Sequence, residues 1–572
     1  MATTNSLRER LGTLSSLTGR WRIGRRAQSE GEPHAPKASP RAGRWRPLAG
    51  SSDELLLVPQ DPRTPDPSFA SELALGQMGL AGMVVDLGGH SPFDISPPSE
   101  AWAAELHAFG WLRHLAATGA PDDRMRARRL VADWLARPAS RHARAIAWRP
   151  DVTARRAMSW LANATLLLDA ADAGHYRNLM QGLDESLRIL ERTRRRNSKG
   201  PHQITVCAGL TTAALALAGH QRHLARSEHA LLAALEQQIL ADGGHVSRNP
   251  ALVLDNLLDL LPLRQCYQAR GLEPPSALLA ATQRMVTFLN HVRLGDGSLA
   301  RFNGTGRIET DALATVLAID QGLGNAGPEV GPTGFVRLAR GATIVVADCG
   351  STPAEAERPF AGCLSFEMTD GPDRLVCNGG MPRHARQDLA TIARATASHS
   401  TLALAAASSL DVTGRRRRGV KAQAGPAAIA PDGSIAVAAE HDGYVASLSI
   451  VHRRRLTLSG DGDCLRVLDT LAPPMGALRT VRDIPFAIHI HLSPEASAQA
   501  GISGTNAIIT LGSGARWRLD VQGARAGIEP ARDFAHLLGV VGTRQVVLRG
   551  ATPGETTVEW SLTRLADAAD RG

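Results

Sequence analysis

The sequence predicts an α+β protein with two large domains, an N-terminal helical domain and a C-terminal antiparallel β-sandwich. From about residue 100 to residue 294, apolar residues recur every three or four positions, which is the period of helices packed on one face. From Gly334 on, short alternating runs are separated by Gly and Asp turns, which is typical of antiparallel strands. With 572 residues, the chain is also too long for one hydrophobic core, since cores stop growing near roughly 250–300 residues.

Residues 1–65 are expected to form a basic, mostly irregular arm, because Arg, Pro, Gly and Ser recur there with little periodicity. The arm has no apolar core of roughly 7–15 residues, which a secretory signal peptide requires. The whole chain has no run of about 18 apolar residues, so no integral membrane segment is predicted.

The helical domain is expected over residues 66–325. After a mixed stretch at 66–98, apolar stripes predict eight or nine helices, the first of them a single helix from Trp102 to Leu115. The later stripes lie at 125–135, 157–168, 183–190, 204–217, 231–239, 252–267 and 278–294, and one shorter helix is expected at 311–319. Such an array is either a superhelical solenoid or a closed toroid, and the lack of a strict repeat period counts against the solenoid.

The β-sandwich domain is expected over residues 334–565, after a boundary rich in Gly and Pro at 322–333. Its stretch 361–404 predicts a β-hairpin and a returning strand. Apolar residues alternate with polar ones at Leu364, Phe366 and Met368, and Asp370-Gly371 is a turn pair.

The charge balance is basic, with 64 Lys and Arg against 55 Asp and Glu, and nearly all of the excess is arginine. Arginine suits carboxylate, sulfate and phosphate groups, so an anionic polymer is one explanation, and a coding bias toward Ala, Arg and Gly is the other. The run Arg415–Arg418 lies in an expected β-turn and is interpreted as a solvated loop, so no nucleic-acid partner is predicted. The six cysteines show no CxxC spacing and indicate neither a zinc site nor a disulfide framework.

Several segments resemble the heparinase II/III-like polysaccharide lyases. They include LSFEM, RLVCNGG and ATASHSTLAL in the β half, and AWRPDVTARRAMSWL and ADGGHVSRNPAL in the helical half, and the likeness extends over about residues 68–564. The resemblance implies an (α/α) toroid followed by a β-sandwich, with an anionic polysaccharide substrate in the cleft between them. It also implies a carbon-oxygen lyase that cleaves a uronate-containing polysaccharide by β-elimination.

Such a lyase neutralises a uronate carboxylate, removes the C5 proton and protonates the leaving oxygen, which are tasks for Asn or Arg and for His and Tyr. His399 matches the sandwich histidine of the family. His202 lies where the family places an Asn-His pair, with Asn197 five residues upstream. His399 and His202 are therefore the predicted catalytic residues, and the alternative for His399 is a histidine hydrogen-bonded within a strand.

The predicted substrate-binding residues are Arg248, His245, Asn197, Trp148 and His491. Arg248, with His245 beside it, could hold an anionic group or form a surface salt bridge. Trp148 precedes an expected helix start, where it either faces the cleft or packs in the core. His491 matches the family pattern on a strand.

Two departures from the family bear on activity. No tyrosine occurs between Ser247 and Asn256, where the family often supplies its catalytic tyrosine, and the chain has only Tyr176, Tyr267 and Tyr444. The second hypothesis is therefore a catalytically impaired protein that binds anionic glycan. A glycoside hydrolase is less favoured, because no acidic pair is singled out.

The second departure concerns metals. Residues 359–363 replace a histidine and an acid that help to bind a divalent metal in many family members, so no metal site and no cofactor are predicted. His489 and His491 could share a metal on one strand face, but the pattern offers no third ligand. The resemblance implies a cell-envelope or periplasmic location, whereas the missing signal core favours the cytoplasm, and both stay open, as does the oligomeric state.

Overall fold

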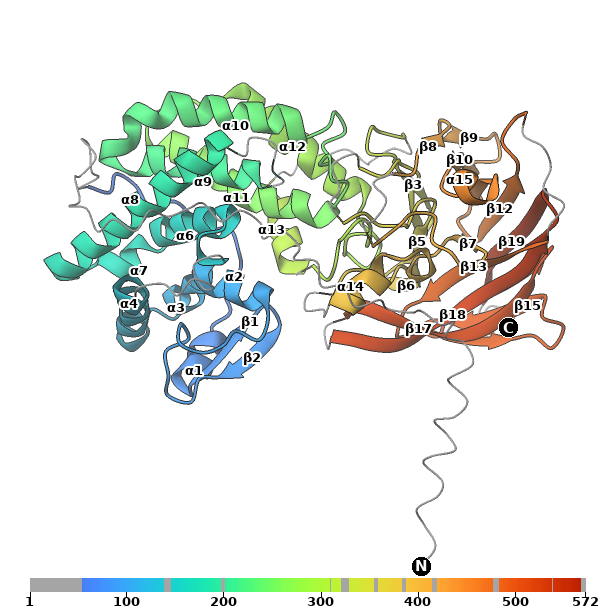
Figure 1. Cartoon of the computed structure of the whole chain (residues 1–572), viewed down its shortest axis with the longest axis horizontal. Coiled ribbons are helices and arrows are strands. Elements are labelled where there is room, and N and C mark those ends of the chain that lie inside the picture. Colours follow the sequence, from blue (N-terminus) through green and yellow to red (C-terminus); the bar gives the residue numbers. More distant parts are fainter. Residues whose placement is uncertain are drawn as a thin grey trace, which may run out of the picture. The chain divides into compact units, whose positions relative to one another are not determined.

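The computed structural model describes residues 54–566 except 138–145, 197–199, 201, 309, 320–328, 354–357, 383–386, 414–418, 477–482 and 537–538. Within these residues, helices fill the N-terminal part and antiparallel strands fill the C-terminal part (Figure 1). The predicted fold class, a toroid-type helical domain followed by a β-sandwich, is confirmed.

The helical part begins with a short helix and a hairpin before the longer helices. Its elements are α1 (Ser68–Ala74), β1 (Gln77–Leu80), β2 (Met83–Asp86), α2 (Glu100–Ala108), α3 (Leu112–Thr118), α4 (Pro121–Ala136), α6 (Pro150–Ala162), α7 (Ala164–Leu168), α8 (Ala173–Arg196), α9 (Gln203–Ala216), η2 (Ala218–His223), α10 (Leu224–Gln238), α11 (Pro250–Ala269), α12 (Ser276–His291) and α13 (Thr310–Ile319). No helix in the described ranges combines the length and the hydrophobicity that a membrane crossing requires.

The single helix predicted from Trp102 to Leu115 is two helices. The Ser99 side chain accepts a hydrogen bond from the Trp102 amide and starts α2, which ends at Phe109 in the left-handed conformation (φ 59°). The chain turns there because the Phe109 ring packs edge-on against Trp134 and Trp160. Periodicity alone missed this break, since both helices present apolar residues to the same core.

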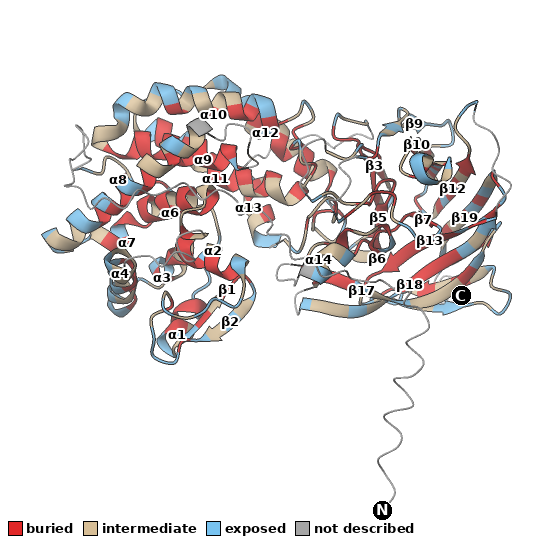
Figure 2. Ribbon diagram, viewed as in Figure 1, coloured by how far each residue is buried: buried red, intermediate tan, exposed pale blue. Residues whose placement is uncertain are grey.

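Helix α9 is buried along its entire length, and α6, α8, α10 and α11 all pack against it (Figure 2). A helix that is buried on every side forms the centre of a helical domain. Its approach to α6 is close, because a Cβ on Gly209 would lie 3.3 Å from the Ala154 Cβ. The middle of α9 is therefore held directly against α6.

Residues 54–65, which the sequence assigns to the arm, are bound to the helical part. Leu55 forms an antiparallel β-bridge with Leu217. Leu57 packs against two separate apolar clusters that the helices form. The Arg63 guanidinium pairs with the buried carboxylate of Asp259 on α11. Apolar and ionic contacts to helices far away in the sequence hold this segment in place. Such contacts cannot be predicted from the periodicity of residues 54–65 themselves.

Two antiparallel sheets form the sandwich. The β5 sheet contains β3 (Phe335–Arg340), β4 (Thr343–Asp348), β5 (Phe366–Asp370), β6 (Asp373–Cys377), β7 (Leu402–Leu404), β13 (Ile484–Leu492), β17 (Arg525–His536) and β18 (Gly539–Thr552). The β12 sheet contains β8 (Ala422–Ala424), β9 (Ala428–Ile429), β10 (Ile435–His441), β11 (Val451–Leu458), β12 (Cys464–Ala472), β14 (Ser497–Ala500), β15 (Asn506–Thr510), β16 (Arg516–Gln522) and β19 (Thr556–Leu565).

Inward-facing residues of both sheets form one apolar core that includes Phe366, Trp517 and Trp560. The predicted hairpin is confirmed as β5 and β6, which pair through Asp370 and Asp373 across the turn. The returning strand is β7, and it pairs with β13 rather than with the hairpin. Three short helices, α14 (Gln387–Arg394), η3 (Thr396–Ser398) and α15 (Val445–Leu448), interrupt the strands.

Candidate active site

His399 lies in a firmly held loop between η3 and β7. The Ser400 amide donates to Asn378 Oδ1 (2.8 Å), and the Ser400 hydroxyl donates to the Cys377 carbonyl (2.8 Å). The Arg454 guanidinium reaches across from β11 and donates to the Ser400 carbonyl (3.1 Å). The backbone on the C-terminal side of His399 is therefore fixed from both sheets.

The His399 ring is buried and adopts one tautomer. Its Nδ1 lies 2.9 Å from the Ala395 carbonyl, which can only accept, so Nδ1 carries the hydrogen and Nε2 holds a free lone pair. Burial lowers the pKa of His399 below its usual value, and the Asp348 charge and the Ala395 carbonyl offset this only in part. The imidazole is thus neutral near pH 7 and can accept a proton at Nε2.

Gly362 and Phe360 line the His399 ring on two of its sides. A Cβ on Gly362 would come within 2.6 Å of the His399 Cδ2 and 3.0 Å of its Nε2, so only glycine fits against this ring edge. The Phe360 ring stands edge-on to His399 at 6.3 Å between centroids. The predicted catalytic histidine therefore lies against the 360–362 loop.

His202 and His245 lie near each other in the helical part. His202 precedes α9 and is exposed, yet the surrounding atoms displace enough water to lower its pKa, against the attraction of Asp151. His245 is buried, its Nδ1 accepts the Ser247 amide (3.0 Å), and its Nε2 faces Gln238 Oε1 (3.3 Å). Burial lowers the pKa of His245 to about 4, and the charge of His202 adds to that shift.

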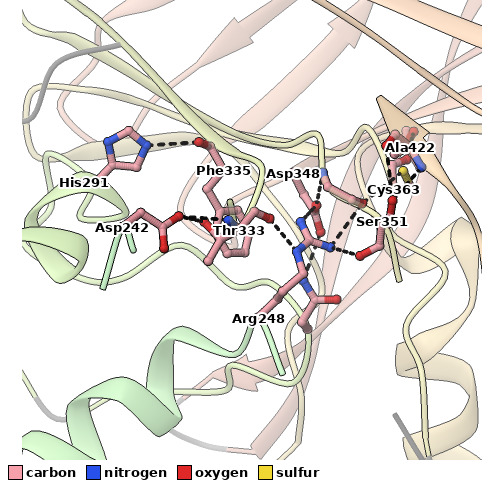
Figure 3. A network of polar contacts seen from close by, with 12 residues as sticks. Asp242, Arg248, His291, Thr333, Phe335, Asp348, Ser351, Cys363 and Ala422 are labelled. Atoms are coloured by element: carbon pink, nitrogen blue, oxygen red, sulfur yellow. Dashed lines mark hydrogen bonds and ion pairs between the residues drawn. The ribbon is translucent and has the colours of Figure 1, made fainter. Parts of the chain in front are cut away.

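Arg248 joins the helical part to the sandwich (Figure 3). Its Nε donates to the Thr333 carbonyl (2.6 Å), its Nη1 to the Ser351 carbonyl (2.9 Å), and its Nη2 pairs with Asp348. The guanidinium also lies over the Phe335 ring at 5.0 Å. These donors are engaged by the chain itself, and a role of Arg248 in substrate binding stays a prediction.

Asn249 was not singled out from the sequence. It lies just before α11, near Phe360, the residue whose ring contacts His399. Its Oδ1 caps α11 by accepting the Ala251 amide (2.9 Å), and it accepts the Thr305 hydroxyl as well (2.9 Å). The Nδ2 group faces Gly304, where a Cβ would lie 3.2 Å from Nδ2 and 3.4 Å from Phe360. Asn249 thus offers an amide donor on the wall that Phe360 shares with His399.

His491 supports the His399 loop from the sheet. Its Nε2 lies 2.9 Å from the Ala397 carbonyl, and its amide donates to the Ser400 hydroxyl (3.0 Å). Its Nδ1 is buried and has no hydrogen-bond partner among the described residues, and burial lowers the pKa of His491 to about 3. The His489 ring stacks on the His491 ring, and His489 Nδ1 lies 3.0 Å from Gln545 Oε1. Both histidine rings of β13 therefore contact other groups inside the protein.

The remaining predicted residues lie elsewhere or outside the description. Trp148 is half-buried, and its ring lies 4.6 Å from the buried Arg156 guanidinium, as does the ring of Trp134, which itself contacts Trp148 at 5.7 Å between centroids. Asn197 lies outside the described residues. Within the described ranges, no group of three or more His, Cys, Asp and Glu side chains is arranged to hold a metal ion.

The three tyrosines all pack against other parts of the protein. The Tyr267 hydroxyl bonds to Glu228 (2.9 Å) and the Tyr444 hydroxyl bonds to the Leu402 carbonyl (3.0 Å). Both rings are buried, and burial raises the pKa of both hydroxyls. Tyr176 packs against the apolar core of the helices.

The neutral buried histidines predict acid instability. The native pKa of His245 is about 4 and that of His491 about 3, whereas both titrate near 6.5 when unfolded. The unfolded state therefore binds more protons as the pH falls below about 6.5. The free energy of unfolding should decrease by about 1.4 kcal/mol per pH unit for each histidine, down to its native pKa.

Urea unfolding at pH 7 and pH 5 measures this effect. In His491→Gln, an amide can still donate to the Ala397 carbonyl but cannot titrate, so this variant should lose its part of the pH dependence. An equal pH dependence in the variant and the original protein would contradict the assignment.

Comparison with known proteins identifies the family. Residues 324–561 match the family Heparinase II/III-like, C-terminal. FtsZ-localized protein C of Caulobacter vibrioides is 32% identical over 538 residues, which cover 89% of this chain and 90% of that protein. The chain belongs to the heparinase II/III-like family.

Solved structures of heparinase III-type proteins share the fold of this heparinase II/III-like chain. A crystal structure of heparinase III has a TM-score of 0.71 at 12% identity, over 89% of this chain and 86% of that one. A mutant of heparan sulfate lyase HepC from Pedobacter heparinus has a TM-score of 0.61 at 15% identity, over 91% and 86%. At these identities, the likeness establishes the polysaccharide-lyase-type fold of this heparinase II/III-like chain and no specific substrate.

Proposed function

We propose that this chain binds an acidic, uronate-containing polysaccharide and cleaves it by β-elimination. The observation that carries the proposal is the state of His399, which is neutral, has Nδ1 bonded to the Ala395 carbonyl and keeps an accepting Nε2. A base held in one tautomer by a rigid loop is suited to removing a proton from carbon.

We assign the other two tasks to Asn249 and His202. The Asn249 amide donates to the uronate carboxylate and so stabilises the charge that develops when the C5 proton leaves. His399 Nε2 takes that proton, the C4–C5 double bond forms, and the C4–O bond breaks. The exposed His202 takes a proton from the solvent and gives it to the departing oxygen, and its lowered pKa makes the protonated ring a stronger acid.

Ultraviolet absorbance tests the reaction directly. β-Elimination leaves a conjugated C4–C5 double bond, so incubation with a panel of acidic polysaccharides should raise the absorbance with at least one of them. A flat trace across the panel, from a protein that still binds one of these glycans, would reject the cleavage step.

Binding of an anionic glycan without cleavage is the second candidate function. The observation in its favour is that Tyr267 and Tyr444 are buried and hydrogen-bonded inside the protein.

The name of the Caulobacter relative also records a location with FtsZ and no reaction. By analogy, a fluorescent fusion of this chain should coincide with FtsZ in cells, and a fusion spread evenly would count against a shared location.

A further inference from the structure

Two arginines beside the His399 loop differ from the other arginines near it. Arg248, Arg301, Arg374 and Arg454 each pair with an Asp or Glu side chain. Arg394, the last residue of α14, and Arg358, just before Pro359 and Phe360, have no carboxylate partner among the described residues. Their positive charges are therefore not neutralised by the ion pairs that stabilise the surrounding structure.

The Arg394 side chain is held in place but retains donor capacity. Only 7% of the residue is exposed. Its Nε donates to the Ala390 carbonyl (3.2 Å) and its Nη2 to the Thr391 hydroxyl (3.2 Å), while Nη1 makes no hydrogen bond with the described residues. The guanidinium is thus oriented by its own helix, with one amino group left for another acceptor.

Arg358 brings a second positive charge to the same place. Its side chain is exposed and forms no ion pair with the described residues. The pKa of Arg394 is lowered by its burial and by the Arg358 charge. Two like charges this near one another are unfavourable by themselves, and an anion between them would remove that cost.

The pair lies on the loop that packs against His399. The Ala361 amide donates to the Arg394 carbonyl (2.9 Å), and the Thr396 hydroxyl donates to the Ala361 carbonyl (2.8 Å). Phe360, between Arg358 and Ala361, contacts the His399 ring edge-on. Arg358 and Arg394 therefore lie on two segments that contact each other, and both segments contact His399.

We propose that Arg358 and Arg394 form a subsite for an oxyanion of the ligand, a carboxylate or a sulfate, next to His399. The planar guanidinium donates paired hydrogen bonds to such groups, and the burial of Arg394 strengthens them. This inference rests on the proposed function for the identity of the ligand. It concerns binding, so it can be tested apart from cleavage.

The experiment measures the Kd of two oligosaccharides of equal length, a sulfated heparin hexasaccharide and its desulfated, N-acetylated form. Arg358→Gln removes the exposed charge without removing a described contact. Arg394→Lys keeps the charge and loses the planar fork. The matched control is Arg455→Gln, because Arg455 on β11 is also exposed and without an ion pair in the described structure. Thermal unfolding checks that all variants are folded.

Arg358→Gln and Arg394→Lys should each weaken binding about 3–10-fold, and Arg455→Gln should not. The dependence of binding on salt should decrease in Arg358→Gln, which loses a charge, and should stay the same in Arg394→Lys, which keeps it. Weakening with the sulfated ligand alone identifies sulfate as the bound group, and weakening with both ligands identifies the carboxylate. Binding without an absorbance change would reject the proposed cleavage and leave the subsite intact. The subsite is rejected if the original protein binds neither ligand, if both variants bind like the original, or if Arg455→Gln weakens binding equally.

Discussion

Replacement of His399 by alanine is expected to reduce β-elimination about 10²–10⁴-fold while glycan binding changes little. The variant loses the Nε2 lone pair that accepts the C5 proton. Two donors proposed to hold the ligand, Arg394 and Asn249, keep their own contacts, and Arg358 keeps its exposed charge. The loss should therefore appear in kcat, with KM close to its original value.

Two controls separate catalysis from folding. His229→Ala removes an exposed histidine on α10 and should leave the rate unchanged. His399→Ala should also keep its thermal unfolding temperature within a few degrees, because Arg454, Asn378 and Cys377 hold the Ser400 backbone independently of the imidazole. Residual activity near the original rate would show that another group removes the proton.

The pH profile offers a second readout of the same residue. Because burial holds the pKa of His399 below its usual value, the base stays unprotonated to a lower pH than a solvent-exposed histidine would. kcat/KM should therefore fall only below the usual range of histidine. An acidic limb centred at or above pH 7 would contradict His399 as the base.

Most of the fold could be predicted from the sequence, because apolar residues recur with the period of a helix or a strand in most elements. The hairpin of β5 and β6 shows alternation and a turn pair, and the helix α13 was expected within one residue of its bounds. The break at Phe109 was missed because its cause is tertiary, the packing of one ring against Trp134 and Trp160. Residues 54–65 were missed for the same reason.

The candidate site was only partly predictable. His399 stood out because the segment around it resembles a family motif. Asn249 did not, since an Asn before a Pro at the start of a helix is fully explained as a cap. Arg248 looks like an available cation in the sequence, but its acceptors, Thr333 and Ser351, lie 85 and 103 residues away. The unpaired state of Arg358 and Arg394 likewise depends on which distant carboxylates come near.

Replacement of Asp469 by alanine is expected to lower the free energy of unfolding by about 3–5 kcal/mol. Its carboxylate is fully buried on β12 and accepts both Arg454 Nε (2.7 Å) and Nη2 (3.0 Å). It also accepts Trp560 Nε1 (3.0 Å) and lies 2.7 Å from His452 Nε2. Removal would leave the buried Arg454 charge without a counter-ion and two further donors without an acceptor.

The effect should reach the candidate site, because Arg454 Nη1 also donates to the carbonyls of Leu364 (2.8 Å) and Ser400 (3.1 Å). Asp469 thus holds Arg454, the residue that fixes the loop after His399.

The matched control is Asp520→Ala on β16 of the same sheet. Its partner Arg518 is about half exposed, so loss of this ion pair should lower the free energy of unfolding by no more than about 1 kcal/mol. Urea midpoints of the two variants provide the comparison. Equal midpoints would mean that solvent or a local rearrangement compensates Arg454, and the sandwich would then not depend on this buried ion pair for its stability.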